Sequence, residues 1–411
     1  MAQHHVRSRQ SRMDMRVVFL SETYPRRMGY LVTMLPRAMA RLGADVHLLA
    51  LDLPPYHYLA KVKDSYQSFF AGQIPEAGTV EMVDGYTVHI LPHRHTLGYA
   101  RMAGLAGKIR ELEPDVVYSS VAIGWLPLQA FLCRLRQRFA LFTGSHTAES
   151  MFPLAGRARP WRSWEGLRCL AQRWLPGRIV SLVTQLCYVP TADCGEIAWR
   201  FFGVQRRKLR VRHLGVDLEV FRPATDADHA IRRDIRSRLG CGDDDVLCVY
   251  SGKLAAYKKP LLLAEAVALL REGGRPFRAL FIGEGEEREA LARSTWCHVL
   301  DSMPYWELGD FYRAADIAVW PFGESTSMLD AAACGIPIVV SDRIYRDHVD
   351  GNGRTYDTGN LMNLVAVLAE LENPALRAAL GRTGAEKMAR QFDWREIARQ
   401  RLEDFRAAVD R

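Results

Sequence analysis

The chain has 411 residues, of which 48% are hydrophobic and 25% are charged. This composition excludes a mostly disordered or fibrous chain, and the length is typical of two domains that each bury a core. The net charge of +8 is unevenly spread: residues 1–215 hold 29 basic and 15 acidic side chains, whereas residues 216–411 hold 26 basic and 32 acidic ones. We therefore expect the basic half to meet an anionic partner, which is nucleic acid, membrane or a phosphorylated substrate.

The first half of the chain predicts strands that alternate with helices. A basic tail, residues 1–14, precedes a short apolar strand at residues 16–21, and a helix follows at residues 31–43. Short apolar strands between helices indicate βαβ units and a parallel sheet that is buried on both faces. The remaining strands of this half are predicted at residues 45–51, 87–91, 116–120, 139–143, 186–190 and 210–213.

Signals for membrane insertion and for an oxidising compartment are weak. The longest uncharged run, residues 116–133, contains Gly124 and Pro127, which favours a strand, a loop and a helix over a membrane span. The basic tail has no apolar stretch of the kind that a signal peptide needs. The eight cysteines form no C-x-x-C pair, so we expect reduced thiols and a cytoplasmic protein.

The alternation restarts after Phe221-Arg222-Pro223. The fold class predicted is α/β, with two doubly wound parallel-sheet domains that face each other across a cleft. We assign residues 1–14 to a flexible tail, 15–220 to an N-terminal domain, 221–390 to a C-terminal domain, and 391–411 to a helix that packs back on the N-terminal domain. The second half has predicted strands at residues 246–251, 278–282, 298–300, 317–320 and 337–341, and predicted helices at residues 260–272, 286–293, 306–315, 328–334 and 394–409.

Two strand ends of the second half carry the residues of a phosphate site. Gly252 and Lys253 follow the strand at residues 246–251, and Lys258 comes five residues later. Two cations beside a glycine can neutralise a diphosphate, whereas the alternative is a solvated surface loop. Gly283 and Gly285 follow the next strand, but the third glycine of a dinucleotide fingerprint is replaced by arginine at position 288, which disfavours nicotinamide binding.

A third strand end leads through a polar loop into an alanine-rich helix. Ser325, Thr326 and Ser327 either cap this helix or place hydroxyls beside an anion at its first turn. Asp330, one turn further, has the chemistry to accept hydrogen bonds from a ribose diol, and the alternative is an acid that balances the helix dipole.

These segments together resemble the donor half of retaining GT-B glycosyltransferases, in particular the large group 1 family, which is family four of that classification. The residues that carry the resemblance are Gly252-Lys253-Leu254 with Lys258, Gly283-Glu284-Gly285, residues 324–337, residues 211–217 and Phe221-Arg222-Pro223. The resemblance covers most of the second half in the same order. The first half matches loosely, through residues 24–43 and Gly144-Ser145-His146.

The resemblance implies a nucleotide-sugar donor and a role for each matching position. Lys253 and Lys258 would face the pyrophosphate, Asp330 the ribose hydroxyls, and Glu324 the donor sugar. Glu324 and Asp330 are six positions apart where the family's paired acids are eight apart. His146 follows a strand where the family often places a histidine near the donor sugar, and Gly29 stands alone where the family has a glycine pair.

The catalytic residues expected from this resemblance are His146, Glu324 and Lys258, and the donor-binding residues are Gly29, Lys253, Lys258, Gly283, Ser325, Thr326, Ser327 and Asp330. In retaining transfer, the lysines and helix N–H groups would stabilise the departing diphosphate, which would serve as base for the acceptor hydroxyl. Glu149 and Glu22 are weaker candidates on the acceptor side.

No metal and no cofactor are expected. The run Asp243-Asp244-Asp245 precedes a strand, whereas ligands bind after strands, so a solvated turn is favoured over a metal site. There is also no cluster of histidine and cysteine with metal-ligand spacing.

The positive charge concentrates in residues 157–178, where arginines alternate with tryptophans. Pro160 is expected to begin a helix and Pro176-Gly177 to end it, and a basic helix with apolar side chains on one face suits an anionic membrane surface. The alternative is a core-packing helix with solvated arginines. The residues of this predicted membrane face are Arg157, Arg159, Trp161, Arg162, Trp164, Arg168 and Trp174, with Arg134, Arg136 and Arg138 as an extension.

The resemblance therefore indicates a retaining hexosyltransferase that uses UDP-hexose or GDP-mannose and a glycan or polyprenyl-linked acceptor in cell-surface polysaccharide synthesis. We expect it in the cytoplasm, peripheral on the inner face of the membrane. Two alternatives are a sugar-nucleotide epimerase of the same fold and a non-enzymatic nucleic-acid-binding protein. The second is disfavoured because no zinc spacing, RNA-binding signature or helix-turn-helix pattern is present, so nucleic acid is not an expected partner.

Overall fold

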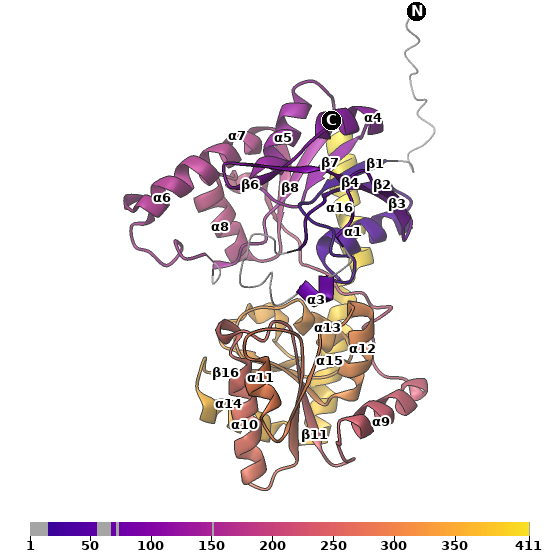
Figure 1. Ribbon diagram of the computed structural model, residues 1–411, viewed down its shortest axis with the longest axis vertical. Helices are drawn as coiled ribbons and strands as arrows, with labels where there is room; N and C mark the ends of the chain where they lie inside the picture. Colours follow the sequence, from indigo (N-terminus) through magenta and orange to yellow (C-terminus); the bar gives the residue numbers. More distant parts are fainter. Residues whose placement is uncertain (1–14, 56–66, 71–73, 150–151, 411) are drawn as a thin grey trace, which may run out of the picture.

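The computed structural model describes residues 15–55, 67–70, 74–149 and 152–410, so the predicted tail at residues 1–14 lies outside the described part of the chain. Figure 1 shows two α/β halves, one above the other, with the yellow C-terminal helix running up into the half that contains the N-terminal strands. The predicted pair of doubly wound sheets is confirmed, because each half carries a sheet of mostly parallel strands with helices packed on it.

The first sheet has eight strands in the order β10-β9-β8-β7-β1-β2-β4-β3, and only β3 runs antiparallel to its neighbour. Its central strands are apolar and fully buried, as the short apolar runs predict. Their bounds are β1 Arg16–Leu20, β2 Asp45–Leu51, β3 Val80–Val83, β4 Tyr86–Leu91, β7 Val116–Ser119, β8 Ala140–Gly144, β9 Thr184–Val189 and β10 Leu209–Val211.

Helices cover both faces of this sheet, and a separate hairpin, β5 His93–Thr96 and β6 Tyr99–Met102, extends from it. This hairpin was not predicted, because its first strand, His93-Arg94-His95-Thr96, has no apolar alternation. The helical segments are α1 Leu31–Arg41, α3 Gln67–Phe70, α4 Leu105–Leu112, α5 Trp125–Arg134, η2 Pro160–Arg162, α6 Trp164–Cys169, η3 Leu170–Trp174, α7 Leu175–Val183, α8 Ala192–Phe202 and η4 Arg206–Lys208.

The predicted helix end at Pro176-Gly177 is wrong. The segment continues from α6 through one π-helical turn, η3, into α7. Pro176 lies directly after the π-helical turn, at the start of α7, and Gly177 lies against α8 rather than at a helix end. A Cβ atom on Gly177 would come within 2.0 Å of the Phe202 carbonyl oxygen, so this glycine permits the close approach of two helices.

The second sheet has six parallel strands in the order β13-β12-β11-β14-β15-β16. The strands are β11 Val246–Ser251, β12 Phe277–Ile282, β13 Cys297–Leu300, β14 Ile317–Trp320, β15 Ile338–Ser341 and β16 Gly353–Tyr356. The helical segments of this half are η5 Asp226–Asp228, α9 His229–Arg238, η6 Ala256–Lys258, α10 Pro260–Glu272, α11 Arg288–Ala292, α12 Tyr305–Ala314, α13 Ser327–Ala333, η7 Arg346–His348, α14 Leu361–Glu370 and α15 Pro374–Gln391.

The chain passes between the halves twice. The first passage is near Val216, and the second leads from α15 into the last helix, α16 Trp394–Val409; a bridge between Val216 and Asp393 joins the two. α16 lies beside α1, and its side chains Ile397, Leu402 and Phe405 belong to the core under the first sheet. The last helix therefore completes the core of the half that begins the chain.

Candidate functional site

A cavity of about 390 Å³ lies between the two halves, at the carboxyl ends of their strands. The first half contributes the loop after β1 and the end of β8, and the second half contributes the loops after β11, β12, β13 and β14. The structure brings all of the predicted catalytic and donor-binding residues to this cavity: Gly29, His146, Lys253, Lys258, Gly283, Glu324, Ser325, Thr326, Ser327 and Asp330.

The glycines at the ends of β11 and β12 allow two loops to touch. Gly252 has a φ of +140° and Gly283 a φ of +154°, which residues with a side chain rarely adopt. A Cβ atom on Gly283 would lie 1.9 Å from the Gly252 carbonyl oxygen. These glycines therefore serve the contact between the loops.

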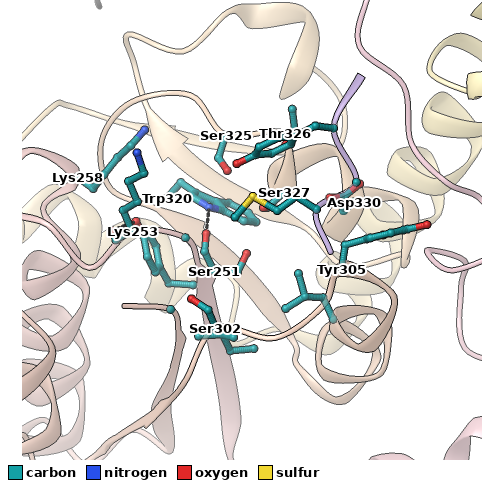
Figure 2. A pocket seen from close by; sticks show the side chains of 18 of the residues that line it. Ser251, Lys253, Lys258, Ser302, Tyr305, Trp320, Ser325, Thr326, Ser327 and Asp330 are labelled. Atoms are coloured by element: carbon teal, nitrogen blue, oxygen red, sulfur yellow. Dashed lines mark hydrogen bonds between the residues drawn. The ribbon is translucent and has the colours of Figure 1, made fainter. Parts of the chain in front are cut away.

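Lys253 and Lys258 place two cations on one side of the cavity (Figure 2). Burial, and then the nearby charge of Lys258, lowers the pKa of Lys253 to about 8. Burial also lowers the pKa of Lys258, whose Nζ atom donates a hydrogen bond of 2.9 Å to the Glu324 carbonyl oxygen. The charge of Lys258 disfavours the protonated form of Lys253, and an anion between the two lysines would relieve that repulsion.

The polar loop before α13 lies between the lysines and Asp330 (Figure 2). Thr326 stands at the start of this helix without a side-chain capping bond, so capping is not its role. Burial, and then the charge of Asp217, raises the pKa of Asp330 well above its usual value. Burial likewise raises the pKa of Glu324, whose Oε1 atom accepts a hydrogen bond of 3.1 Å from the Tyr345 N–H. The cavity thus offers cations on one side and hydroxyl or carboxyl groups on the other.

His146 reaches the cavity from the end of β8 in the first half. Its ring is accessible from the cleft, yet the surrounding protein, and then the charge of Arg401, lowers its pKa to about 4. Arg401 comes from α16, is fully buried, and donates a hydrogen bond of 3.2 Å to the Tyr118 hydroxyl. At neutral pH the imidazole is therefore uncharged and can exchange hydrogen bonds with a ligand hydroxyl without adding positive charge.

Tyr305, Trp320 and Ser302, which were not predicted as site residues, also line the cavity. The Trp320 indole N–H donates to the Ser251 carbonyl oxygen over 3.0 Å (Figure 2). Tyr305 joins the halves: its N–H donates to the Arg27 carbonyl oxygen at 2.9 Å. Ser302 and Tyr305 follow β13, so their position after a predicted strand was the signal that could have found them.

The predicted membrane residues lie elsewhere, around η2, α6 and η3 of the first half. Trp164 is exposed, whereas Trp161 is partly buried against Phe201, so Trp161 belongs to the core rather than to an outer face. Glu22, a candidate on the acceptor side, lines a second cavity beside α6, and the side chain of Glu149 is exposed.

The prediction of a solvated turn at residues 243–245 holds for the first two aspartates only. Asp245 is partly buried and forms ion pairs with Arg271 and Arg278, so it is a structural acid of the second half. Within the described residues, no group of three or more histidine, cysteine, aspartate or glutamate side chains is placed to hold a metal ion, and no helix is long and apolar enough to span a membrane.

Two family models match this chain. Residues 28–220 match the model described as "Glycosyltransferase Family 4", and residues 245–373 match the one described as "Glycosyl transferases group 1". The first covers the half that contributes His146, and the second covers the half that contributes both lysines and Asp330.

Curated relatives named D-inositol 3-phosphate glycosyltransferase match part of the chain. The protein of Xylanimonas cellulosilytica is 31% identical over 242 residues, which are 54% of this chain and 56% of that protein. The protein of Pseudarthrobacter chlorophenolicus is 30% identical over 259 residues, 57% of this chain and 58% of that protein. The match thus spans a little more than half the length of these relatives.

Solved glycosyltransferase structures share the fold over nearly the whole chain. Sucrose-phosphate synthase from Thermosynechococcus elongatus has a TM-score of 0.70 and 14% identity, with 96% of this chain and 98% of that one covered. WaaG, a glycosyltransferase involved in lipopolysaccharide biosynthesis, has a TM-score of 0.65 and 14% identity, with 95% and 99% covered. The two facing sheets therefore form the GT-B fold that the sequence resemblance implies.

Proposed function

Because the chain belongs to the group 1 glycosyltransferases with the GT-B fold, we propose that it moves a hexose from a nucleoside diphosphate sugar, UDP-hexose or GDP-mannose, to a glycan or lipid-linked acceptor. The observation that carries this proposal is the arrangement of Lys253 and Lys258 on one side of a single interdomain cavity and Asp330 on the other. A diphosphate would meet the two cations, and a ribose diol would meet the carboxyl group of Asp330.

The chemistry we propose follows from where charge develops. As the bond between the sugar and the diphosphate breaks, negative charge grows on the departing phosphate, and Lys253 and Lys258 stabilise it. Neutral His146 holds a hydroxyl of the donor sugar. We propose that the acceptor hydroxyl attacks from the face that the diphosphate leaves, passes its proton to the departing phosphate, and so retains the anomeric configuration.

This proposal is tested by incubating the full chain with UDP- and GDP-hexoses in the presence and absence of a bacterial lipid extract. We expect release of UDP or GDP that depends on the extract, and an α-linked product from an α-linked donor by NMR. Conversion of the donor without any acceptor would support an epimerase instead. A product of inverted configuration would refute retention while leaving sugar transfer intact.

We also propose that the enzyme acts in cell-surface polysaccharide synthesis at the inner face of a membrane. Support comes from a row of exposed apolar side chains on α6, η3 and α7. Residues 157–178, which overlap these helices, hold six arginines and one acid, Glu165. Apolar side chains flanked by arginines suit the surface of an anionic bilayer, and the shared positive charge disfavours pairing with a second copy. We name this surface the apolar stripe; its members are Trp164, Leu167, Leu170, Leu175, Ile179 and Leu182.

The membrane proposal is tested by sedimentation with liposomes. We expect recovery with anionic liposomes that falls as salt increases, and little recovery with neutral ones. Changing Trp164 and Leu182 to serine should reduce recovery, whereas Met362→Ser, at an equally exposed apolar side chain of the other half, should not. Equal recovery from neutral and anionic liposomes would refute the proposal.

A further inference from the structure

A second hollow, of about 910 Å³, opens between the β5–β6 hairpin and α6. It begins at the carboxyl end of the first sheet, where Glu22 and Thr147 line it. The chain neighbours of Thr147, His146 and Ala148, line the interdomain cavity, so the two cavities share a wall. A ligand in this hollow therefore lies beside the point where a sugar would leave its donor. We name it the hairpin hollow.

The charge of the hairpin hollow is positive. Arg157 is paired with the exposed carboxylate of Glu165 at 3.1 Å. The partners of the other two arginines are neutral: Arg168 donates to the Gln172 amide oxygen at 3.0 Å, and Arg173 donates to the Tyr99 hydroxyl at 3.2 Å. Within the described residues neither of these two arginines forms an ion pair, so their charges are available to a ligand anion.

The rest of the lining is largely apolar and extends from a buried wall to an exposed rim. Phe152, Leu154 and Phe202 form a buried wall, and Arg173 lies over the Phe152 ring at 5.6 Å. At the rim, Trp164 belongs both to the hollow and to the apolar stripe, and 77% of it is exposed. Figure 1 shows α6 at the outer edge of the first half.

A single class of ligand fits both features, an amphiphile with an anionic head and an apolar tail. We propose that the hairpin hollow binds the phosphate of a lipid-linked acceptor at Arg168 and Arg173, while the lipid tail leaves along Trp164 and the apolar stripe. Arginine forks hold phosphate oxygens through paired hydrogen bonds, and the apolar wall and stripe cover the first part of the tail.

Glu22 would then face the acceptor's own sugar at the inner end of the hollow. Burial raises the pKa of its carboxyl group, which lines the hollow at the carboxyl end of the first sheet and is a hydrogen-bond partner for an acceptor hydroxyl. This inference rests on the proposed transfer reaction for its biological meaning. Binding in the hollow does not require the donor and is measured without it.

The test is direct binding of farnesyl phosphate to the full chain, followed by tryptophan fluorescence, with farnesol and inorganic phosphate as separate ligands. We expect farnesyl phosphate to bind at least about tenfold more tightly than either, because it alone offers both head and tail. Changing Arg168 and Arg173 to glutamine should weaken it by about tenfold or more, and Arg168→Gln alone, at an exposed side chain, by less.

Arg207→Gln is the matched control, since Arg207 is also exposed and also donates to a nearby glutamine, Gln205, at 3.1 Å. It should bind farnesyl phosphate as the parent does. Equal affinity of the Arg168 and Arg173 variants and the parent, or equal affinity for farnesol, would overturn the inference. Stabilisation by UDP or GDP, measured on the same variants, separates the two proposals, because it depends on the interdomain cavity alone.

Discussion

The charge of His146 depends on a side chain 255 positions further along the chain. Arg401 is fully buried between the rings of Tyr118 and Tyr188, with its guanidinium carbon 4.5 Å from the Tyr188 ring centre. Its charge opposes protonation of His146, in addition to the larger effect of desolvation by the surrounding protein. A residue of the last helix thus contributes to the low pKa of a cleft residue of the first half.

Replacing Arg401 by methionine should therefore raise the pKa of His146 above its present value of about 4, while desolvation by the surrounding protein keeps it below the ordinary value. The measurement is an NMR titration of the His146 ring. Arg399→Met is the control on the same helix, because Arg399 pairs with Glu396 and Glu403 at the surface. An unchanged His146 titration in the Arg401 variant would show that the buried charge does not act on the ring.

Lys253 gives donor binding a dependence on pH. Its pKa of about 8 means that it is charged below pH 8 in the free protein and loses its proton above that pH. A bound diphosphate favours the charged form, so affinity for UDP or GDP should be full below pH 8 and fall by up to about tenfold per pH unit above it. Calorimetry across this range measures how steeply the affinity falls with pH. In Lys253→Met, which has no amine to titrate at this position, only the pH dependence that comes from the nucleotide's own ionisation should remain.

At this scale, part of the site could be predicted from sequence and part could not. Lys253, Lys258 and Asp330 follow predicted strands, and strand ends of a parallel sheet meet at one edge, so their convergence was predictable. The contact of Arg401 with Tyr118 depends on how the last helix crosses the sheet, for which one sequence holds no local signal.

The helical segment α6–η3–α7 shows that the end of a helix, too, can depend on tertiary contacts for which the local sequence holds no signal. Local rules predicted the alternation of strands and helices in both sheets. By the same rules, a proline followed by glycine is a common helix end. Here Gly177 lies in a continuing helix because α8 comes too close for any side chain. The need for that glycine arises in tertiary packing, which explains why local reasoning gave the wrong end.

Gly177→Ala should consequently destabilise the first half. The added methyl group would meet the Phe202 carbonyl oxygen at 2.0 Å, and overpacking of this kind costs about 1–3 kcal/mol of unfolding free energy. Gly107→Ala, in the exposed part of α4 with open space around it, should stabilise the chain by about 0.5–1 kcal/mol. Urea unfolding of the two variants provides the comparison, and equal stability would contradict the packing account.

Across the whole molecule, α16 ties the C-terminus to the first sheet. Phe405 is fully buried, with its ring centre 4.5 Å from that of Phe142. The sequence predicts the last helix at residues 394–409 and its packing on the N-terminal half. The partner side chains on the sheet could not be predicted, because they lie far away in the sequence.

Phe405→Ala should lower the unfolding free energy of the first half by about 3–5 kcal/mol, since it removes a buried aromatic ring. In hydrogen exchange, amides of β8 and β9 should lose protection while those of β11 and β12 keep theirs. Val409→Ala, near the exposed end of the same helix, should change stability by less than about 0.5 kcal/mol. Loss of protection in both sheets alike would show that the halves unfold as one unit.

The central claim is that a nucleoside diphosphate binds between the halves through the two lysines. Its most direct test is isothermal titration of UDP and GDP into the full chain and into Lys258→Ala. We predict that one of the two nucleotides binds the parent with a single site, and that the variant binds it at least about tenfold more weakly, as the loss of a charge-assisted hydrogen bond requires. Binding of neither nucleotide, or equal affinity of parent and variant, would contradict the account.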